Sequence, residues 1–393
     1  MRIRVIEGIV AAGAVAVLIT AMVPGAWRGA EETPKTADPL PPPRPPVQEI
    51  KGIYLTSWSA ATPSRVNHAI QLIRQTELNA VVIDVKDFAG KVFFKTSNAS
   101  ISDLKSIEPR IGDLKRLVDR FHENGIYVIV RIAVFQDQHL LKVRPDLAIR
   151  SASGQIWRDR MGLGWVDPAS EEVWRYIVEI GREAAAAGVD ELNFDYIRFP
   201  SDGDVDDIRY PVFDKSIRTR RQVIQSFFGY LTSQLRSTGA VLSADVFGLV
   251  TVRADDMGIG QVLEDALMHF DVVSPMVYPS HYGRGFMQFR NPAEHPYEVV
   301  HYSLAKAAER RHRLFEAFTS FTPPGTMPTE MHVAAIRPWL QAFDLGAPYP
   351  PSAIRTQMRA TMDAGFHDGW LLWSASNKYA GESFVREPQT GER

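Results

Sequence analysis

VDELNFDYIRFP, at residues 189–200, is the most informative stretch of this 393-residue sequence. Its centre is typical of a β-strand, because Leu192 and Phe194 alternate with acidic and amide side chains. Strands of parallel sheets are buried on both faces and are usually apolar throughout, so a polar row along such a strand is unusual. The carboxylate of Asp195 at the carboxyl end of this strand therefore predicts a functional site.

The rest of the chain alternates between strand-like and helix-like segments from residue 51 onward. We predict strands at 52–58, 79–86, 126–132, 189–200, 241–247, 271–278, 335–343 and 369–374. We predict helices between them, at 63–76, 113–124, 170–187, 214–238, 259–268, 297–311 and 352–364. Eight strand-then-helix units, less a final helix, favour an α/β fold of the (β/α)8 TIM barrel type with long βα loops.

Two points of this fold prediction have alternatives. The seventh strand has a rival in Leu314–Thr319. A doubly wound sheet is the alternative architecture, but it normally carries a glycine-rich phosphate-binding turn after the first strand. Residues 58–62 read WSAAT at that place and contain no glycine, so the barrel is favoured.

Composition excludes several classes of function. The chain is 45% hydrophobic and 23% charged, as in globular proteins. Its net charge of -2 gives no general attraction to nucleic acid, which we do not expect as a partner. The absence of cysteine excludes disulfides, thiolate metal sites and cysteine nucleophiles.

The amino-terminal segment predicts export. Arg2 and Arg4 precede an apolar run at residues 8–23, which resembles a signal peptide or a membrane anchor within residues 1–30. Its length does not separate the two, so the membrane is a partner if the segment is uncleaved. Residues 31–49 are proline-rich and predict a disordered linker, followed by the barrel at 50–380 and a tail at 381–393. We expect an exported protein, either membrane-anchored or periplasmic or extracellular.

Polar and aromatic residues gather where the predicted strands end. In a barrel these ends converge on one rim, where such enzymes place their chemistry. Buried carboxylates are costly unless they are paired or used. For any single residue, the alternative to a functional role is a structural ion pair, such as Asp84–Lys86 or Asp195–Arg131, in which the two charges merely satisfy each other. Polar or aromatic ends on six or seven strands, with tryptophans beside carboxylates, instead indicate a sugar-binding cleft.

Six motifs resemble the putative glycosyl hydrolase domain family, a barrel family related to the glycoside hydrolases. They are KGIY at 51–54, VIDVKD at 82–87, NFDYIRFP at 193–200, ADVFG at 244–248, SPMVYPSHY at 274–282 and RPWLQ at 337–341. The resemblance covers about residues 50–380. It implies a TIM barrel, glycosidase activity and a polysaccharide or oligosaccharide substrate.

Similarity to other glycosidase families narrows the mechanism. Laid on the chitinase pattern DxxDxDxE, the chain has Ile197 at the position of the catalytic glutamate, which disfavours chitinase chemistry. In amylase-like barrels the aspartate of strand four is the nucleophile, and the acid lies on strand five. That similarity implies Asp195 as nucleophile and Asp245 as acid, with aspartate in place of the usual glutamate.

Our hypothesis is a two-carboxylate glycoside hydrolase that acts on a cell-wall or extracellular polysaccharide. One carboxyl group protonates the leaving oxygen, and an ionised one attacks or activates water. We assign Asp195 as nucleophile or base and Asp245 as acid, with Asp84 and Asp87 in reserve. No cofactor is expected. Substrate binding is assigned to Trp58, Asp84, Lys86, Asp87, Arg131, Asn193, Tyr196, Arg198, Tyr278, His281 and Trp373.

Two other functions remain open at this point. The first is a carbohydrate-binding barrel without turnover, tethered at the cell envelope. The second is a metal-dependent hydrolase that gathers a cation between the rim carboxylates and His281. No His-x-His or His-Glu-x-x-His spacing supports a metal site, so no metal is assigned.

Overall fold

The computed structural model describes residues 49–321 and 332–384. Eight parallel strands form a closed barrel, because the first strand pairs with both the second and the last. In order around the barrel they are β1 (Ile50–Leu55), β2 (Ala80–Lys86), β5 (Tyr127–Ala133), β7 (Glu191–Asp195), β9 (Val241–Phe247), β10 (Val272–Met276), β12 (Trp339–Gln341) and β13 (Gly369–Trp373). The predicted TIM barrel is confirmed.

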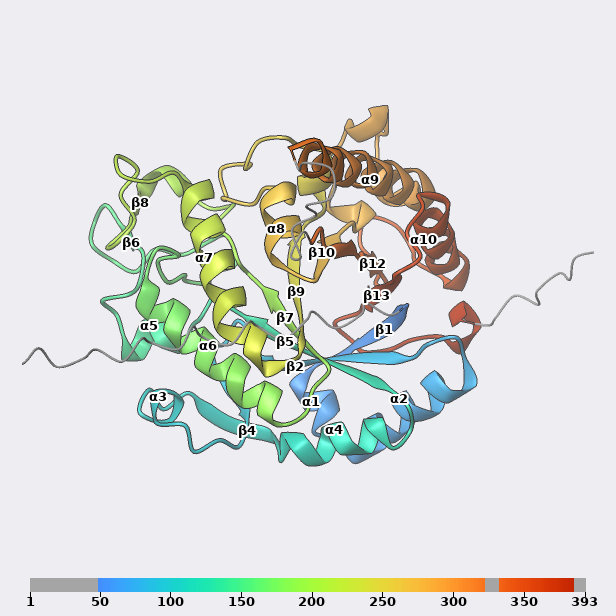
Figure 1. Ribbon diagram of the computed structural model, residues 1–393, viewed down its shortest axis with the longest axis horizontal. Helices are drawn as coiled ribbons and strands as arrows, with labels where there is room; N and C mark the ends of the chain where they lie inside the picture. Colours follow the sequence, from blue (N-terminus) through green and yellow to red (C-terminus); the bar gives the residue numbers. More distant parts are fainter. Residues whose placement is uncertain (1–48, 322–331, 385–393) are drawn as a thin grey trace, which may run out of the picture. The chain divides into compact units, whose positions relative to one another are not determined.

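Helices alternate with these strands and cover the outside of the barrel (Figure 1). They are α2 (Pro63–Gln75), α4 (Leu114–His122), α6 (Glu171–Ala186), α7 (Arg220–Leu235), α8 (Leu263–His269), α9 (Pro296–Phe321) and α10 (Pro351–Asp363). Local signals fix several helix starts. Pro63 stands at the first position of α2, and Thr219 and Gln222 form a capping box at α7.

Shorter elements lie in the loops. They are α1 (Ser57–Ala60), β3 (Val92–Phe94), α3 (Ala99–Ser102), β4 (Ile107–Gly112), α5 (Leu140–Val143), β6 (Arg150–Ser151), β8 (Ile208–Arg209) and β11 (Ala335–Ile336). β6 and β8 pair with each other. This pairing ties the long loop after β5 to the loop after β7.

Three predicted strands differ clearly from the structure. The fourth, predicted at 189–200, is limited to Glu191–Asp195. The first strand ends at Leu55 instead of Trp58, because Thr56 caps the short helix α1. The seventh is divided into β11 and β12 on either side of Pro338, which lacks the backbone N–H that a ladder needs. Its rival, Leu314–Thr319, lies inside α9.

The barrel interior is apolar in its middle and charged towards both ends. Inward-facing Tyr54, Val82, Ile129 and Leu371 belong to one buried cluster, separate from the larger core between strands and helices. The polar face of β7 points inward as well. Because Glu191, Asn193 and Asp195 share that face, one strand supplies polar groups at three levels of the barrel.

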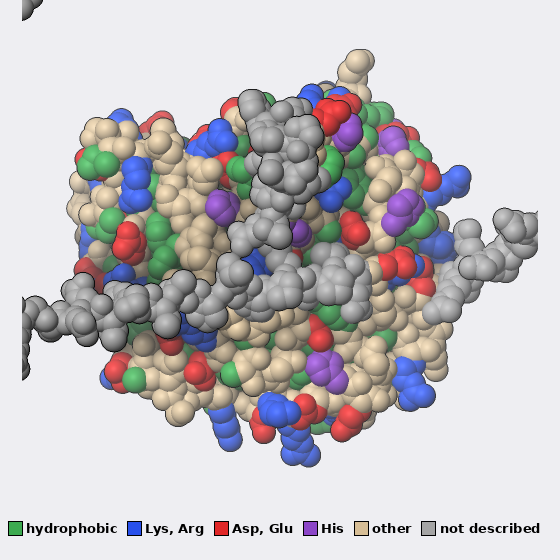
Figure 2. Space-filling model, in the orientation of Figure 1, with side chains coloured by type: hydrophobic (Ala, Val, Ile, Leu, Met, Phe, Trp, Pro, Cys, Tyr) green, Lys and Arg blue, Asp and Glu red, His purple; other side chains and the backbone are tan. Residues whose placement is uncertain are grey.

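The predicted signal or anchor segment and the proline-rich linker lie outside the described residues. None of the helices in the described ranges is long and apolar enough to cross a membrane. On the face seen in Figure 2, basic and acidic side chains are interspersed and do not segregate by sign.

Candidate active site

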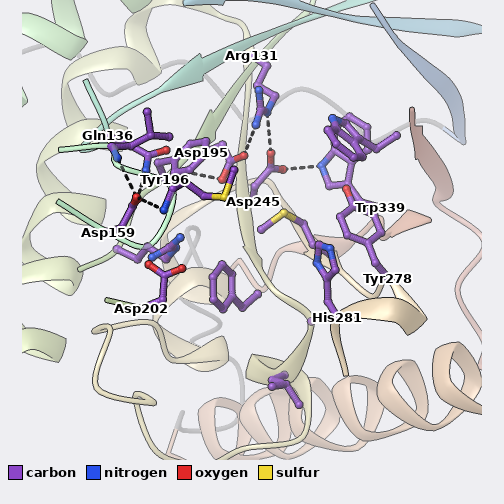
Figure 3. A pocket seen from close by; sticks show the side chains of 18 of the residues that line it. Arg131, Gln136, Asp159, Asp195, Tyr196, Asp202, Asp245, Tyr278, His281 and Trp339 are labelled. Carbon is purple, nitrogen blue, oxygen red and sulfur yellow. Dashed lines mark hydrogen bonds and ion pairs between the residues drawn. The ribbon is translucent and has the colours of Figure 1, made fainter. Parts of the chain in front are cut away.

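A cavity of about 690 Å³ opens at the carboxyl ends of the barrel strands. In Figure 3, Asp195 and Asp245 lie between two walls of this cavity. Gln136, Asp159 and Asp202 come from the long loops after β5 and β7, and Tyr278, His281 and Trp339 come from the side of β10 and β12. The predicted rim site therefore coincides with a real cavity.

Arg131 lies at the base of the cavity and contacts three carboxyl groups. Its Nη1 donates to Asp84 Oδ1 at 2.7 Å, and its Nη2 donates to Asp195 Oδ2. Its Nε lies 3.6 Å from Asp245 Oδ2. One cation thus holds together carboxyl groups from three different strands, β2, β7 and β9, and the surrounding negative charges raise the pKa of Arg131.

Asp245 is almost fully buried, with 1% of its surface exposed. Its Oδ1 accepts hydrogen bonds from Asn193 Nδ2 at 2.9 Å and from Trp339 Nε1 at 2.7 Å. Burial and the negative charge of Asp195 raise the pKa of Asp245 well above its usual range. This carboxyl group therefore favours its protonated form.

Asp84 lies beside Arg131 and does not itself line the cavity. It accepts a hydrogen bond from the hydroxyl of Tyr54, and burial raises its pKa above the usual range. Its Oδ1 and Oδ2 both have partners, so its contact with substrate would be indirect. Asp84 supports the position of Arg131.

The chain turns sharply where β7 ends. Tyr196 has a φ of 55°, in the left-handed region, and its N–H donates to Asp195 Oδ1. Beyond this turn Arg198 lines the same cavity, with its guanidinium 4.7 Å from the ring centre of Trp165 and 4.4 Å from that of Phe247. Burial lowers the pKa of Arg198 to about 10, so it remains charged at neutral pH.

The opposite wall is aromatic. Tyr278 contacts the rings of His281 and Trp373 at centroid distances of 5.1 and 6.1 Å. Burial lowers the pKa of His281, which favours a neutral imidazole. Burial and the nearby Asp245 and Asp195 raise the pKa of Tyr278, which therefore stays a neutral hydroxyl. This wall offers ring faces and neutral polar groups to a ligand.

Besides Asp84, four residues assigned to substrate binding do not line the cavity. Lys86 is fully buried and pairs with Asp137 at 2.9 Å, while its Nζ also donates to the carbonyl of Ala133. Asp87 accepts from the N–H of Ala89 in a turn. Trp58 is 64% exposed on α1, with Arg110 over its ring. Asn193 lies below the cavity and acts through Asp245.

Other cavity residues were not assigned from the sequence. Trp339 and Tyr54 were quoted only as parts of motifs, yet they contact Asp245 and Asp84. Asp159 and Asp202 lie on the long loops. Asp159 accepts from Gln136, Trp165 and two backbone N–H groups, so its role is to hold its loop together.

The chain matches the model of the family described as a putative glycosyl hydrolase domain over residues 52–379. The chain belongs to this family. A hypothetical protein from Ruminiclostridium thermocellum is 33% identical over 53% of this chain and 98% of its own, with a TM-score of 0.45. No curated protein matches the sequence significantly.

Members of the wider glycoside hydrolase group share the fold. The PgaB (BpsB) glycoside hydrolase domain from Bordetella bronchiseptica is 16% identical over 84% of this chain and 95% of its own, with a TM-score of 0.56. A chitobiase from Flavobacterium johnsoniae is 12% identical over 87% of this chain, with a TM-score of 0.53, and this chain spans 49% of that enzyme. At these identities the similarity concerns the fold alone.

Among the described residues, no group of three or more histidine or acidic side chains is arranged to hold a metal ion. The rim carboxylates instead surround the guanidinium of Arg131. A cation is already present in the cluster as a side chain.

Proposed function

We propose that the chain is a glycoside hydrolase that cleaves a cell-wall or extracellular polysaccharide, with Asp195 and Asp245 as its two carboxyl groups. One observation carries the proposal: both groups meet at the base of one aromatic-walled cavity, but in different settings. Asp195 is paired directly with Arg131, whereas burial raises the pKa of Asp245. Glycoside hydrolysis needs one ionised and one protonated carboxyl group.

The hydrogen bonds of Asp245 locate the acidic proton. Because Oδ1 already accepts from Asn193 and Trp339, the proton of the neutral form lies on Oδ2. Transfer of this proton to the glycosidic oxygen accompanies breakage of the bond to the anomeric carbon, and the leaving sugar departs as an alcohol. Asp195 either attacks the anomeric carbon or takes a proton from the water that does so.

The walls of the cavity suit a sugar ring. The half-buried ring of Trp373 offers apolar area for the C–H face of a pyranose, and the Tyr278 hydroxyl and neutral His281 offer hydrogen bonds. A polysaccharide of the cell envelope also agrees with the export, by a signal peptide or a membrane anchor, that the sequence of residues 8–23 predicts. Cell fractionation that finds the full chain in the cytosol would contradict that location.

The test of function is hydrolysis by the full chain. We would incubate it with a panel of cell-wall and extracellular polysaccharides and measure released oligosaccharides and reducing ends. Asp195→Asn and Asp245→Asn should each lower the rate by about 10²- to 10⁴-fold, the usual contribution of a positioned acid or base. Asp255→Asn, at an exposed ion pair with Arg253, is the matched control and should leave the rate unchanged.

The rival is a carbohydrate-binding barrel without turnover. It is favoured by the near-complete burial of Asp245, whose Oδ1 is occupied by two protein donors. In that case a glycan binds, no product appears, and Asp245→Asn leaves the affinity unchanged. Measurement of binding and product release on the same glycan therefore separates the two functions.

A further inference from the structure

Arg198 is the second arginine of the cavity, and its setting is unlike that of Arg131. Only 9% of its surface is exposed, and its guanidinium carbon lies 4.7 Å from the ring centre of Trp165 and 4.4 Å from that of Phe247. Its Nη1 donates to the carbonyl of Phe199 at 3.0 Å and to Ser201 Oγ at 3.2 Å. Two aromatic rings thus contact the guanidinium, and one of its nitrogens donates hydrogen bonds to the protein.

The other edge of the guanidinium, formed by Nε and Nη2, has no protein partner. Neither nitrogen donates a hydrogen bond to a residue in the described ranges, and no carboxylate there lies within 4.0 Å of Arg198. Asp195 and Asp202 attract it only from a longer distance. Because neither nitrogen is sealed from solvent and Arg198 lines the cavity, this edge is open to a ligand.

The Nε and Nη2 edge is the side-on fork of arginine, whose two parallel N–H groups match the two oxygens of a carboxylate. This chain uses the edge repeatedly in that way. Four arginines hold one carboxylate with both nitrogens, in the pairs Arg144–Asp146, Arg221–Asp265, Arg253–Asp255 and Arg310–Glu264. Arg198 has the same fork directed to a cavity, with no protein carboxylate in it.

The energetic setting favours an anion in that place. A charge held in a buried, ring-lined site is costly unless an opposite charge pairs with it, and neutral sugar hydroxyls do not neutralise it. Because Nε and Nη2 carry the N–H groups that have no acceptor among the described residues, a counter-ion would bind at this edge, where the fork accepts a planar group with two oxygens.

We propose that Arg198 binds a carboxylate carried by the glycan, so that the ligand of this cavity is a uronate-containing polysaccharide. That the ligand is a glycan rests on the proposed function, whereas the preference for an anionic group rests on Arg198 itself. A sulfate ester shares the anionic chemistry, but its tetrahedral oxygens fit the planar fork less well than a carboxylate does.

The experiment compares acidic glycans with neutral counterparts of the same skeleton. The full chain is titrated calorimetrically with oligomers of glucuronate, galacturonate and mannuronate, and with the same oligomers after reduction of each carboxyl group to a hydroxymethyl group. Sulfated neutral oligomers form the third arm. We expect at least one uronate oligomer to bind about ten- to a hundredfold more tightly than its reduced form, as for a charge-assisted pair.

Variants test whether the Nε and Nη2 fork of Arg198 causes the preference for uronate. Arg198→Gln should abolish it, and Arg198→Lys should keep only a small part, because lysine retains the charge but not the parallel donors. Asp202→Asn should strengthen uronate binding, since it removes a negative charge from the same cavity. Arg253→Gln, at an exposed pair outside the cavity, is the control and should bind as the parent does. Thermal unfolding confirms that each variant is folded.

Several outcomes overturn the inference. They are equal or tighter binding of the reduced oligomers, absence of binding by every uronate oligomer, tighter binding of the sulfated arm, or a uronate preference that survives Arg198→Gln. Hydrolysis of neutral glycans alone would overturn it while the proposed hydrolase function stands. Arg198-dependent uronate binding without any product would support it while the hydrolase function fails.

Discussion

Two buried arginine clusters lie inside the same barrel, and they differ in charge balance and in access. Near the start of β7, Arg337 pairs with Glu191 alone, with Nη1 2.8 Å from Oε2, and both side chains are sealed from solvent. At the other end, Arg131 faces Asp84, Asp195 and Asp245 below an open cavity. A one-to-one sealed pair suits a structural role, whereas surplus carboxyl groups beside a cavity suit chemistry.

The largest expected contrast is between two residues on the same face of β7. Asp195→Asn should lower hydrolysis by about 10²- to 10⁴-fold, because the group is the proposed nucleophile or base. Its free energy of unfolding at pH 7 should not fall, since the variant removes one of three carboxyl groups that share Arg131. Steady-state rates measure the hydrolysis, and urea unfolding measures the free energy of unfolding. A loss of stability with unchanged turnover would show that Asp195 has a structural role, like that of Glu191.

Glu191→Gln should show the opposite behaviour. It leaves the guanidinium of Arg337 buried without a counter-charge, which costs about 3–5 kcal/mol of unfolding free energy. The rate per folded molecule should stay close to that of the parent. The double variant Glu191→Gln with Arg337→Met should recover much of the loss, because it removes the unpaired charge. A single variant as stable as the parent would show that the pair contributes nothing.

Asp245→Asn should change how stability depends on pH. Burial raises the pKa of Asp245, so the folded chain holds this proton more tightly than the unfolded chain does. The associated stability is fully present below the unfolded pKa of about 3.9 and is lost as pH rises through the folded pKa. Asparagine does not titrate, so the variant does not lose stability in this way as pH rises. The variant should resemble the parent near pH 4 and exceed its unfolding free energy at pH 8.

The size of this gain is on the order of 1 kcal/mol for each pH unit by which the pKa is raised. Urea unfolding of parent and variant from about pH 4 to 8 measures it. Asp255→Asn, at an exposed ion pair, serves as the control and should leave the pH dependence of the parent in place. If the unfolding free energies of parent and Asp245→Asn changed with pH in parallel, Asp245 would have the same pKa in the folded and the unfolded chain.

The smallest contrast concerns one tyrosine hydroxyl at each cluster. Tyr54→Phe removes a direct donor to buried Asp84 and should cost about 1–2 kcal/mol. Tyr127→Phe removes a longer contact of 3.3 Å to Glu191, which already has two bonds from Arg337, and should cost less. Urea unfolding compares them, and a larger loss for Tyr127→Phe would reverse the ranking of the two clusters.

The sequence was sufficient for the barrel and for the meeting of Asp195, Asp245 and Arg131. Strand periodicity gave the inward face of each strand, and barrel closure brings those faces to one rim. The same reasoning fails for Lys86, which it places at the rim. The register of β2 against β5 shifts between Asp84 and Lys86, so the side chain of Lys86 leaves the rim and pairs with Asp137.

Residues outside regular strands were harder to place. Trp339 follows Pro338, which divides the seventh strand and hides its alternation in the sequence. Asp159 and Asp202 belong to long loops, whose path depends on contacts between the loops, such as the pairing of β6 with β8. No periodic pattern encodes such contacts, so only the structure reveals that these two residues reach the cavity.

The left-handed turn at Tyr196 carries backbone strain that the packing of its ring offsets. A tyrosine with a φ of 55° is about 1–2 kcal/mol less favourable than a glycine there. Tyr196→Gly would relieve this strain, but it would also lose the packing of the half-buried ring against Trp165 and should lower the stability, because truncation of a packed aromatic side chain costs about 3–5 kcal/mol. The same change removes a ring from the cavity and loosens the link between Asp195 and Arg198. Stabilised descendants of this chain should therefore retain Tyr196 together with its strained turn.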